Sequence, residues 1–403
     1  MKSTYFTITP RDPVIARDAR PFGFGIRMKS LDWPYPSVLA GSLRTMLGKT
    51  EKGGDFSPET VLWLKDLAIS GPFPLVDGSL FFPAPKDILL KDLKNDRFEA
   101  FPLRPAEMDK GEGCDLPHPA LLPAMLPEDV TDEFKPANVA PFWSLKTMVS
   151  WLTESTDPSF PSRISAVHKG ADSLQYPEKD ARIHVKIVDE RGVADDGMLF
   201  ETIGLDFTAK RKSVGDQVRI AARMDSDGGC SRVDTLHPFG GERRLAHWRS
   251  CDDQKGWTCP AEIKTSLEKC GRVRMVLATP AIFSGGWLPG WLGEKKGQLV
   301  GSPPGGPDGL ELKLVSACVD RWKPLSGWSL ETRGPKAIRR VVPSGSVYFF
   351  ERLGESAAAV AETLWLQSVS DDPQDRLDGF GLALWGSWSN GEKGSISDEM
   401  KEE

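Results

Sequence analysis

The residues of this chain whose types could do chemistry are arginines and lysines that stand close to glycines and aromatic residues. They interleave in three stretches, Arg11–Phe24, Arg243–Trp248 and Arg333–Phe350. A guanidinium group pairs with phosphate oxygens or stacks on a base, and an aromatic ring offers a stacking surface. The pattern therefore indicates RNA binding, and the density of positive charge is highest at Lys336, Arg339 and Arg340.

A glycine-rich stretch near the C-terminus, residues 376–388, places Gly379, Gly381 and Gly386 around an apolar run. It lacks the third glycine of a dinucleotide-binding fingerprint and the Lys-Ser/Thr pair of a mononucleotide P-loop. One interpretation is a flexible lip at a sheet edge that offers backbone N–H groups to a polyanion such as RNA. The other is a buried C-terminal strand in which glycine allows a close backbone approach, and the spacing alone favours it.

Catalytic and metal chemistry have less support. None of the five histidines lies in a G-x-S-x-G or H-E-x-x-H context. His168, beside Arg163 and Lys169, would suit a general base for RNA cleavage, although a structural or RNA-contacting histidine explains it as well. The cysteines and histidines between Cys230 and Cys270 contain no C-x-x-C pair and match no zinc-module spacing. We expect no catalytic residue, no metal and no cofactor.

The composition excludes several classes of protein. A formal net charge of −6 argues against a protein that coats DNA through bulk positive charge, although local Lys and Arg can still form a nucleic-acid groove. Six cysteines in 403 residues do not suggest a disulfide scaffold. The N-terminus carries no apolar signal segment, and no run approaches the roughly 18 apolar residues of a membrane helix. We expect a soluble cytoplasmic protein with two domains.

The elements that would position these residues begin with a short strand, Thr4–Thr9, in which polar and apolar side chains alternate. The arginine-rich loop follows directly. Ser37 then stands at or near the N-cap of a helix that carries three leucines on one face and ends at Gly48. Arg44 falls off that apolar stripe, so it is either a solvated surface charge or a phosphate contact beside the first strand.

Later segments continue the mixture of strands and helices. Strands are predicted at 183–188, 198–207, 218–222, 272–278, 312–319 and 346–350, and helices at 60–69, 142–151 and 356–365. The proline-rich stretch 83–141 is expected to be a long, mostly irregular insertion. This order predicts an α+β fold with helices on one face of each sheet, as in ferredoxin-like units.

Several of these motifs together resemble a known family. Residues 10–23 resemble the N-terminal signature of the third subunit of the Cmr complex, the type III-B CRISPR–Cas effector, a family of the RAMP superfamily. Residues 33–44 are similar to its first helix, and Gly240–Arg244 is similar to its central Gly-Gly-Glu element. Its C-terminal half is matched by Thr279–Ala281 with Gly286-Trp287, by Val342–Tyr348 and by Gly379–Gly386.

The resemblance implies an α+β fold of two ferredoxin-like (RRM-like) domains packed together, with long loop insertions. We place the first domain at residues 1–210 with its insertion at about 83–141, the second at 211–390, and an acidic tail at 391–403. The resemblance also implies a non-catalytic subunit. Such a subunit grips the 5′ handle of the CRISPR RNA and docks against the Cas10-type large subunit and the backbone RAMP subunits.

Carried onto this sequence, the family's RNA contacts fall on Arg17, Arg20, Ser37, Arg44, Arg243, Gly379, Gly381 and Gly386. Charge density adds Lys336, Arg339 and Arg340. The glycine loop carries no Lys or Arg between Gly381 and Gly386, so we expect backbone N–H contact rather than charge pairing there. The alternative function is a RAMP endoribonuclease that processes CRISPR RNA, with His168 or another histidine as its base.

Overall fold

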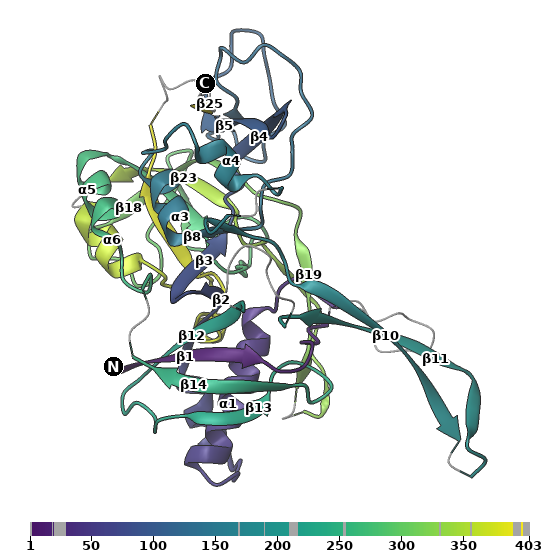
Figure 1. Ribbon diagram of the computed structural model, residues 1–403. Coiled ribbons are helices and arrows are strands. Elements are labelled where there is room, and N and C mark those ends of the chain that lie inside the picture. The colour runs from purple at the N-terminus through teal and green to yellow at the C-terminus, as the bar shows by residue number, and fades with distance from the viewer. Residues whose placement is uncertain are drawn as a thin grey trace. The chain divides into compact units, whose positions relative to one another are not determined.

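The structure is a computed structural model that describes residues 2–17, 19, 30–167, 170–188, 190–208, 217–252, 255–329, 332–354, 357–389 and 396–397 (Figure 1). Over these residues the architecture is a mixed α/β one with seven helices. Every strand pair with a described register is antiparallel. None of the described helices is long and apolar enough to cross a membrane.

The chain divides into two compact units, each assembled from three separated segments. Unit 1 comprises Met1–Val76, Tyr176–Asp252 and Lys323–Arg340, and unit 2 comprises Asp77–Gln175, Asp253–Trp322 and Val341–Glu403. The sequence predicted two contiguous domains that meet near residue 210. The division differs because strands distant in sequence pair within each unit, which local patterns do not reveal.

Five neighbouring strands of one antiparallel sheet, in the order β13-β14-β1-β12-β2, form the centre of unit 1. These strands are β1 (Lys2–Pro10), β2 (Ala68–Val76), β12 (Arg219–Ser226), β13 (Asp234–Pro238) and β14 (Leu245–Cys251). β1 confirms the predicted first strand, and its alternation buries Phe6 and Ile8 completely. Phe6 lies opposite Ala222 of β12 and Ser250 of β14, so β1 is an interior strand of the sheet.

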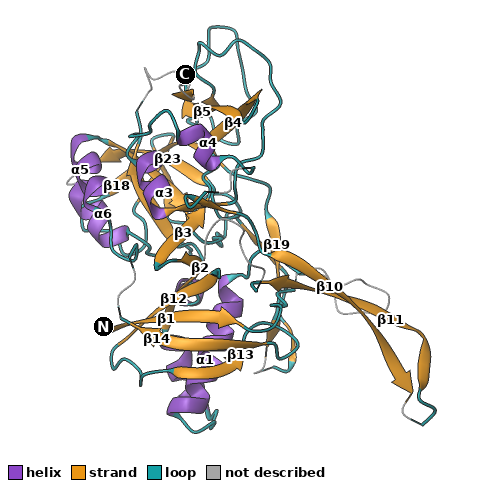
Figure 2. Ribbon diagram, viewed as in Figure 1, coloured by secondary structure: helices purple, strands orange, loops and turns teal. Residues whose placement is uncertain are grey.

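Helix α1 (Pro36–Glu51) packs on this sheet, and α2 (Pro58–Asp66) follows it (Figure 2). The predicted apolar face is confirmed, because Leu39, Leu43 and Leu47 are buried in the core of unit 1. Ser37 lies near the N-cap as predicted, in the first turn after Tyr35, which is the N-cap itself. The predicted end was wrong, because the helix continues past Gly48 to Glu51. A Cβ atom on Gly48 would lie 2.6 Å from the Phe56 ring, so the glycine is explained by packing.

The strand order of unit 1 is that of a ferredoxin-like sheet, but the set of helices is not complete. Counted along the chain, β1, β2, β12 and β14 are the first to fourth strands. Across the sheet they lie in the order β14-β1-β12-β2, that is fourth, first, third and second, which is the ferredoxin-like order. Such a unit has a second helix between its third and fourth strands. Residues 227–244 are all described and form β13 instead, so the complete ferredoxin-like fold is not confirmed.

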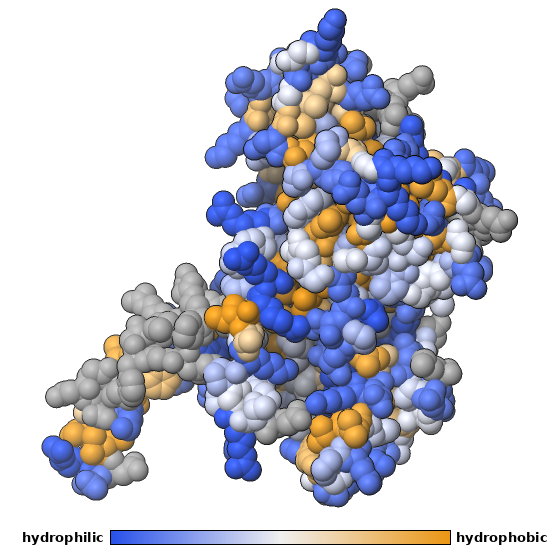
Figure 3. All heavy atoms as spheres, turned by 180° about the vertical axis from the view of Figure 1, so that it is seen from behind, coloured by the Kyte–Doolittle hydropathy of each residue, from blue (hydrophilic) through white to orange (hydrophobic). Residues whose placement is uncertain are grey.

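A long two-stranded hairpin projects from unit 1, formed by β10 (Glu178–Val188) and β11 (Val193–Asp206) (Figure 1). Apolar side chains on β10 alternate with polar ones, so they share one face of the hairpin. Ile183 of β10 is 73% exposed, and Leu199, which lies opposite Val185, is 68% exposed. Figure 3 shows such hydrophobic atoms exposed along this arm, which lies at the lower left of that view.

The central sheet of unit 2 has the order β16-β17-β18-β23-β15-β24. Its strands are β15 (Arg272–Leu277), β16 (Leu292–Lys295), β17 (Gln298–Gly301), β18 (Glu311–Cys318), β23 (Val347–Leu353) and β24 (Ala383–Ser387). The strands β15, β18, β23 and β24 again follow the ferredoxin-like order. Here the helix missing is the one after the first strand, because residues 278–310 are all described and form the β16–β17 hairpin and loops.

Helices cover this sheet, and the insertion has strands of its own. α5 (Ala261–Lys269) and α6 (Ala357–Leu364) lie side by side (Figure 2); unit 2 also contains α3 (Leu145–Leu152), α4 (Phe160–Ile164) and α7 (Pro373–Leu377). The remaining strands of the unit are β3 (Ser79–Pro83), β4 (Ile88–Lys94), β5 (Arg97–Pro102), β6 (Arg104–Pro105), β7 (Ala124–Met125), β8 (Phe142–Ser144), β9 (Ser173–Leu174) and β25 (Ile396–Ser397). The stretch 83–141 is therefore less irregular than predicted, since β4 and β5 form a hairpin within it.

Candidate RNA interface

The arginine-rich N-terminal loop is held in unit 1 by backbone pairing. Val14 exchanges both backbone hydrogen bonds with Leu205 of β11, and Arg17 forms an isolated bridge with Ser30. Ser30 Oγ also accepts from the N–H of Ala16 at 3.1 Å. These contacts fix the main chain from Val14 to Arg17, whose side chain is half-buried. Arg20, the second arginine predicted in this loop, lies outside the described residues.

The Gly-Gly-Glu turn packs directly against this loop. A Cβ atom on Gly240, whose φ is +83°, would lie 2.6 Å from the carbonyl oxygen of Ile15, so only glycine fits. The N–H of Gly241 donates to the same oxygen at 2.7 Å. Arg243 follows in the left-handed region, with φ of 51°, and its side chain is exposed. Through this contact with Ile15, the fold brings the start of the Arg11–Phe24 segment close to the turn that precedes Arg243.

Ser37 and Arg44 both lie on α1, with different outcomes. Ser37 is half-buried in the first turn. Arg44 Nη2 donates to the carbonyl oxygens of Lys65 at 3.3 Å and Leu67 at 3.0 Å, at the C-terminal end of α2. A guanidinium group at this position satisfies carbonyls that the helix leaves unpaired. Neither alternative for Arg44 foresaw this structural contact, and its RNA-binding role stays a prediction.

The densest positive charge lies on a hairpin that we call the basic ribbon, Lys323–Arg340. Its strands are β19 (Lys323–Leu325), β20 (Trp328–Ser329), β21 (Gly334–Pro335) and β22, which runs one residue further (Arg339–Val341). β19 pairs with β22, and β20 pairs with β21. All of the described cations of the ribbon are exposed: Lys323, Arg333, Lys336, Arg339 and Arg340.

The sequence located half of this ribbon and missed the other half. Lys336, Arg339 and Arg340 were singled out by charge density, whereas Lys323 and Trp328 were not. Trp328 is 51% exposed and lies directly opposite Pro335. Lys323 and Trp328 stand in the same stretch of sequence as the later cations, but only strand pairing places them beside those cations.

The glycine loop is buried, which corrects the expectation of a flexible lip. All residues from Gly379 to Gly386 are buried, and β24 pairs with β15 from Ala383 to Ser387. A Cβ atom on Gly381 would lie 2.5 Å from Ser370 Oγ, and one on Gly386 would lie 2.5 Å from the carbonyl oxygen of Leu152. The structure therefore agrees with the second interpretation, a buried C-terminal strand in which glycine allows close packing.

The backbone donors of this loop are already in use. The N–H groups of residues 379 to 383 donate to Arg376, Asp375, Pro280, Thr279 and Gln367, respectively. No N–H group between Gly379 and Ala383 remains to bind RNA in this arrangement. The RNA-binding role of Gly379, Gly381 and Gly386 stays a prediction, but the donors on which it was based are committed to the fold of unit 2.

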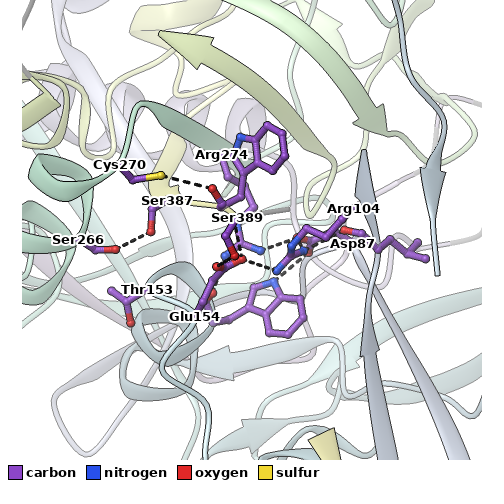
Figure 4. Close-up of polar contacts among 12 residues, drawn as sticks. Asp87, Arg104, Thr153, Glu154, Ser266, Cys270, Arg274, Ser387 and Ser389 are labelled. Carbon is purple, nitrogen blue, oxygen red and sulfur yellow. Dashed lines mark hydrogen bonds and ion pairs between the residues drawn. The ribbon is translucent and has the colours of Figure 1, made fainter. Parts of the chain in front are cut away.

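Unit 2 contains a cluster of charged side chains, which is a second group of polar residues outside the basic ribbon (Figure 4). Arg274 of β15 and Asp87 are both 0% exposed, and Arg274 Nη1 lies 2.6 Å from Asp87 Oδ2. Trp151 Nε1 donates to the other carboxylate oxygen at 2.9 Å, and Arg274 Nη2 donates to the Trp151 carbonyl oxygen. Both oxygens of Asp87 are therefore engaged.

Arg104 and Glu154 complete the cluster. Arg104 Nη2 lies 2.8 Å from Glu154 Oε1, and its Nη1 lies 3.4 Å from Asp87. Burial lowers the pKa of Arg104, and the second guanidinium group nearby acts in the same direction. Burial opposes ionisation of Glu154, yet Arg104 and Arg274 hold its pKa below the ordinary value. Two positive and two negative groups thus balance in one network, which links parts of unit 2.

The described histidines show no catalytic arrangement. His184 Nε2 lies 2.8 Å from Thr202 Oγ1, and His247 Nε2 lies 2.5 Å from Asp234 Oδ1, while His237 is buried. His168, the predicted base of the alternative function, lies outside the described residues. Among the residues that the structure describes, no three His, Cys, Asp or Glu side chains gather as metal ligands would.

Residues 6–388 match the family model described as CRISPR-associated protein (Cas_Cmr3). The chain belongs to the Cas_Cmr3 family. The resemblance seen in the sequence is confirmed at the level of this family, and membership supports a role in a CRISPR–Cas effector. A comparison with curated proteins found no match.

Solved structures similar to this member of the Cas_Cmr3 family come from type III complexes. A chain of the type III-B Cmr-beta complex bound to cognate target RNA and AMPPnP has 15% identity and a TM-score of 0.48, and 86% of each chain is covered. A second Cmr-beta structure, bound to cognate target RNA, has 16% identity, a TM-score of 0.47 and the same coverage. A chain of the Csm3–Csm4 subcomplex of type III-A has 11% identity and a TM-score of 0.36, with 87% of this chain and 94% of that chain covered.

Proposed function

We propose that this protein is the third subunit of a type III-B Cmr effector complex and acts in the cytoplasm. In the proposal it is a non-catalytic RNA-binding subunit. It holds the 5′ handle of the CRISPR RNA and docks against the Cas10-type large subunit and the backbone RAMP subunits. Family membership supports the complex, and the basic ribbon of unit 1 supports the RNA.

The basic ribbon is the observation that carries RNA binding. Its sequence contains five Lys and Arg and one carboxylate, Glu331, within a chain whose net charge is −6. Five exposed cations on a single narrow hairpin create a local positive field that attracts a polyanion. A chain of phosphates is such a polyanion, and binding it releases counterions and depends steeply on salt.

Salt dependence tests this assignment. We would measure binding of the full chain to a 5′-handle RNA by fluorescence anisotropy at several salt concentrations. The triple variant Lys336→Gln, Arg339→Gln and Arg340→Gln should bind more weakly. Its slope of log K against log salt should be shallower by about 2, since each single-strand phosphate contact contributes roughly 0.7.

The matched control removes the same number of charges elsewhere. Lys110, Lys135 and Lys296 are exposed lysines of unit 2, and changing all three to Gln alters the net charge equally. Its salt slope should equal that of the unchanged protein. Equal slopes for the ribbon variant and this control would mean that the ribbon does not contact the phosphates.

The exposed face of the β10–β11 hairpin supports docking to a protein. Residues Glu178–Asp206 contain eight Asp and Glu against four Lys and Arg, so the field of the hairpin repels RNA phosphates. Apolar side chains exposed on an isolated two-stranded hairpin mark an interaction surface, because such a hairpin is marginally stable alone. We assign this face, with Ile183 and Leu199, to a neighbouring protein subunit.

Co-purification tests the docking face. Ile183→Asp with Leu199→Asp should lower recovery of the large and backbone subunits with a tagged copy, while RNA binding by the isolated chain is kept. Leu62→Asp is the control, since Leu62 on α2 is exposed to a similar extent, at 63%. Full recovery of the subunits with the hairpin variant would remove this face from the proposal.

A CRISPR-RNA-processing endoribonuclease is the second candidate function. Incubating the protein with repeat RNA distinguishes it from the non-catalytic subunit. Purified protein mixed with CRISPR repeat RNA should leave the RNA intact. Site-specific cuts that disappear in His168→Ala would instead establish the nuclease and overturn the non-catalytic role.

A further inference from the structure

The basic ribbon carries an aromatic side chain that charge alone does not explain. Trp328 of β20 exposes 51% of its surface, in the same hairpin as five exposed cations. The half of this ring that stays in water contributes nothing to folding, because apolar area stabilises the fold only where it leaves water. An indole ring among cations is instead the composition of a surface that binds unpaired bases.

Hydrogen bonds hold this part of the ribbon in a defined register. Trp328 lies opposite Pro335, and the N–H of Lys336 donates to the Gly327 carbonyl oxygen at 2.8 Å. Ser326 Oγ donates to the Lys336 carbonyl oxygen, also at 2.8 Å. These bonds fix the backbone of Trp328 relative to the backbones of Pro335 and Lys336 on the other side of the ribbon.

We propose that the basic ribbon is a site for single-stranded RNA in which Trp328 stacks on one unpaired base. Arg333, Lys336, Arg339 and Arg340 pair with the flanking phosphates. This inference rests on the proposed RNA-binding function and adds the form of the RNA and the residue that reads it. A duplex cannot use the site fully, because its bases are stacked within the helix and only its phosphates remain available.

The full chain and short RNA oligonucleotides test the inference. Trp328→Ala should weaken binding of a single-stranded oligonucleotide by about 5- to 150-fold, the range that corresponds to roughly 1–3 kcal/mol per stacked base. Trp328→Phe keeps an aromatic face and should recover most of the affinity. Neither variant should change the salt slope, because no charge is lost.

Two controls separate stacking from general damage. Leu236→Ala removes an apolar side chain of similar exposure, 57%, from β13 of the same unit and should leave binding unchanged. A duplex of the same sequence should bind more weakly, and Trp328→Ala should not affect it.

The possible outcomes distinguish this inference from the function on which it rests. If the ribbon lysine and arginine variants flatten the salt slope while Trp328→Ala binds like the unchanged protein, the stacking site is refuted and RNA binding stands. If the unchanged protein binds no RNA, both fall. If poly-glutamate binds in place of RNA and Trp328→Ala weakens that binding, the ribbon serves an acidic protein partner and the inference is overturned.

Discussion

Replacing Asp87 with asparagine removes the negative charge at the centre of the buried cluster in unit 2. Asp87 is 0% exposed and accepts from Arg274 at 2.6 Å and from Trp151 Nε1 at 2.9 Å. Arg274 is also 0% exposed, so its positive charge would lose its closest counter-charge with no access to water. Arg104 would lose a more distant one, at 3.4 Å, while it keeps Glu154.

The size of the effect follows from this burial. Breaking a buried pair by removing one partner costs about 3–5 kcal/mol, because an uncompensated charge remains inside the protein. An isosteric amide can still accept one hydrogen bond, so we expect the lower half of this range, about 3–4 kcal/mol. A domain of about 200 residues shifts its Tm by roughly 2–4 °C per kcal/mol, which predicts a drop of about 6–16 °C.

Calorimetry of the full chain measures this change, with Asp308→Asn as the control. Asp308 is exposed in the same unit, so the same chemical change should shift the transition by about 1 °C or less. The double variant Asp87→Leu with Arg274→Met removes both charges and should cost less than the sum of the single variants. An Asp87→Asn transition within about 2 °C of the unchanged protein would refute the assignment of the cluster as a charge network in which Asp87 stabilises unit 2.

Two further predictions concern one residue in each unit. Burial, together with Lys49, lowers the pKa of His237 to about 4, so the unfolded chain binds a proton first as the pH falls below about 6.5. Stability should therefore drop from pH 6.5 towards 4, and His237→Gln should remove about 1–3 kcal/mol of that drop in urea unfolding; parallel pH profiles would contradict this. In unit 2, Gly386→Ala places a Cβ atom 2.5 Å from the Leu152 carbonyl oxygen and should cost about 1–3 kcal/mol, whereas Gly271→Ala meets nothing within 4 Å and should be nearly neutral. Equal stabilities of the two glycine variants would show that the packing at Gly386 relaxes freely.

Local patterns in the sequence determined the individual elements well. The alternation at Thr4–Thr9 identified β1, and the leucine spacing identified α1, because both repeats depend only on which side of the backbone a residue faces. Element ends were less well predicted. Gly48 continues the helix, since the Phe56 ring takes the space of its missing Cβ atom, and that contact belongs to the tertiary structure.

The sequence also predicted the positive charge of the later half of the basic ribbon. Its motifs indicated the family to which the chain belongs. Lys336, Arg339 and Arg340 are exposed as their density suggested. Whether two segments lie together is decided only by the fold. The contact of Gly240 with Ile15 joins the two arginine segments, and the pairing of Trp328 with Pro335 places an aromatic ring among the cations.

The glycine loop shows the limit most clearly. Its sequence is compatible with an open lip and with a buried strand, because glycine permits a close approach by RNA or by the protein's own backbone alike. The pairing of β24 with β15 and the packing of Gly386 on Leu152 select the strand. The glycines in the sequence therefore make a close backbone approach possible in this stretch. Long-range packing decides that the approaching group is the protein's own backbone and not RNA.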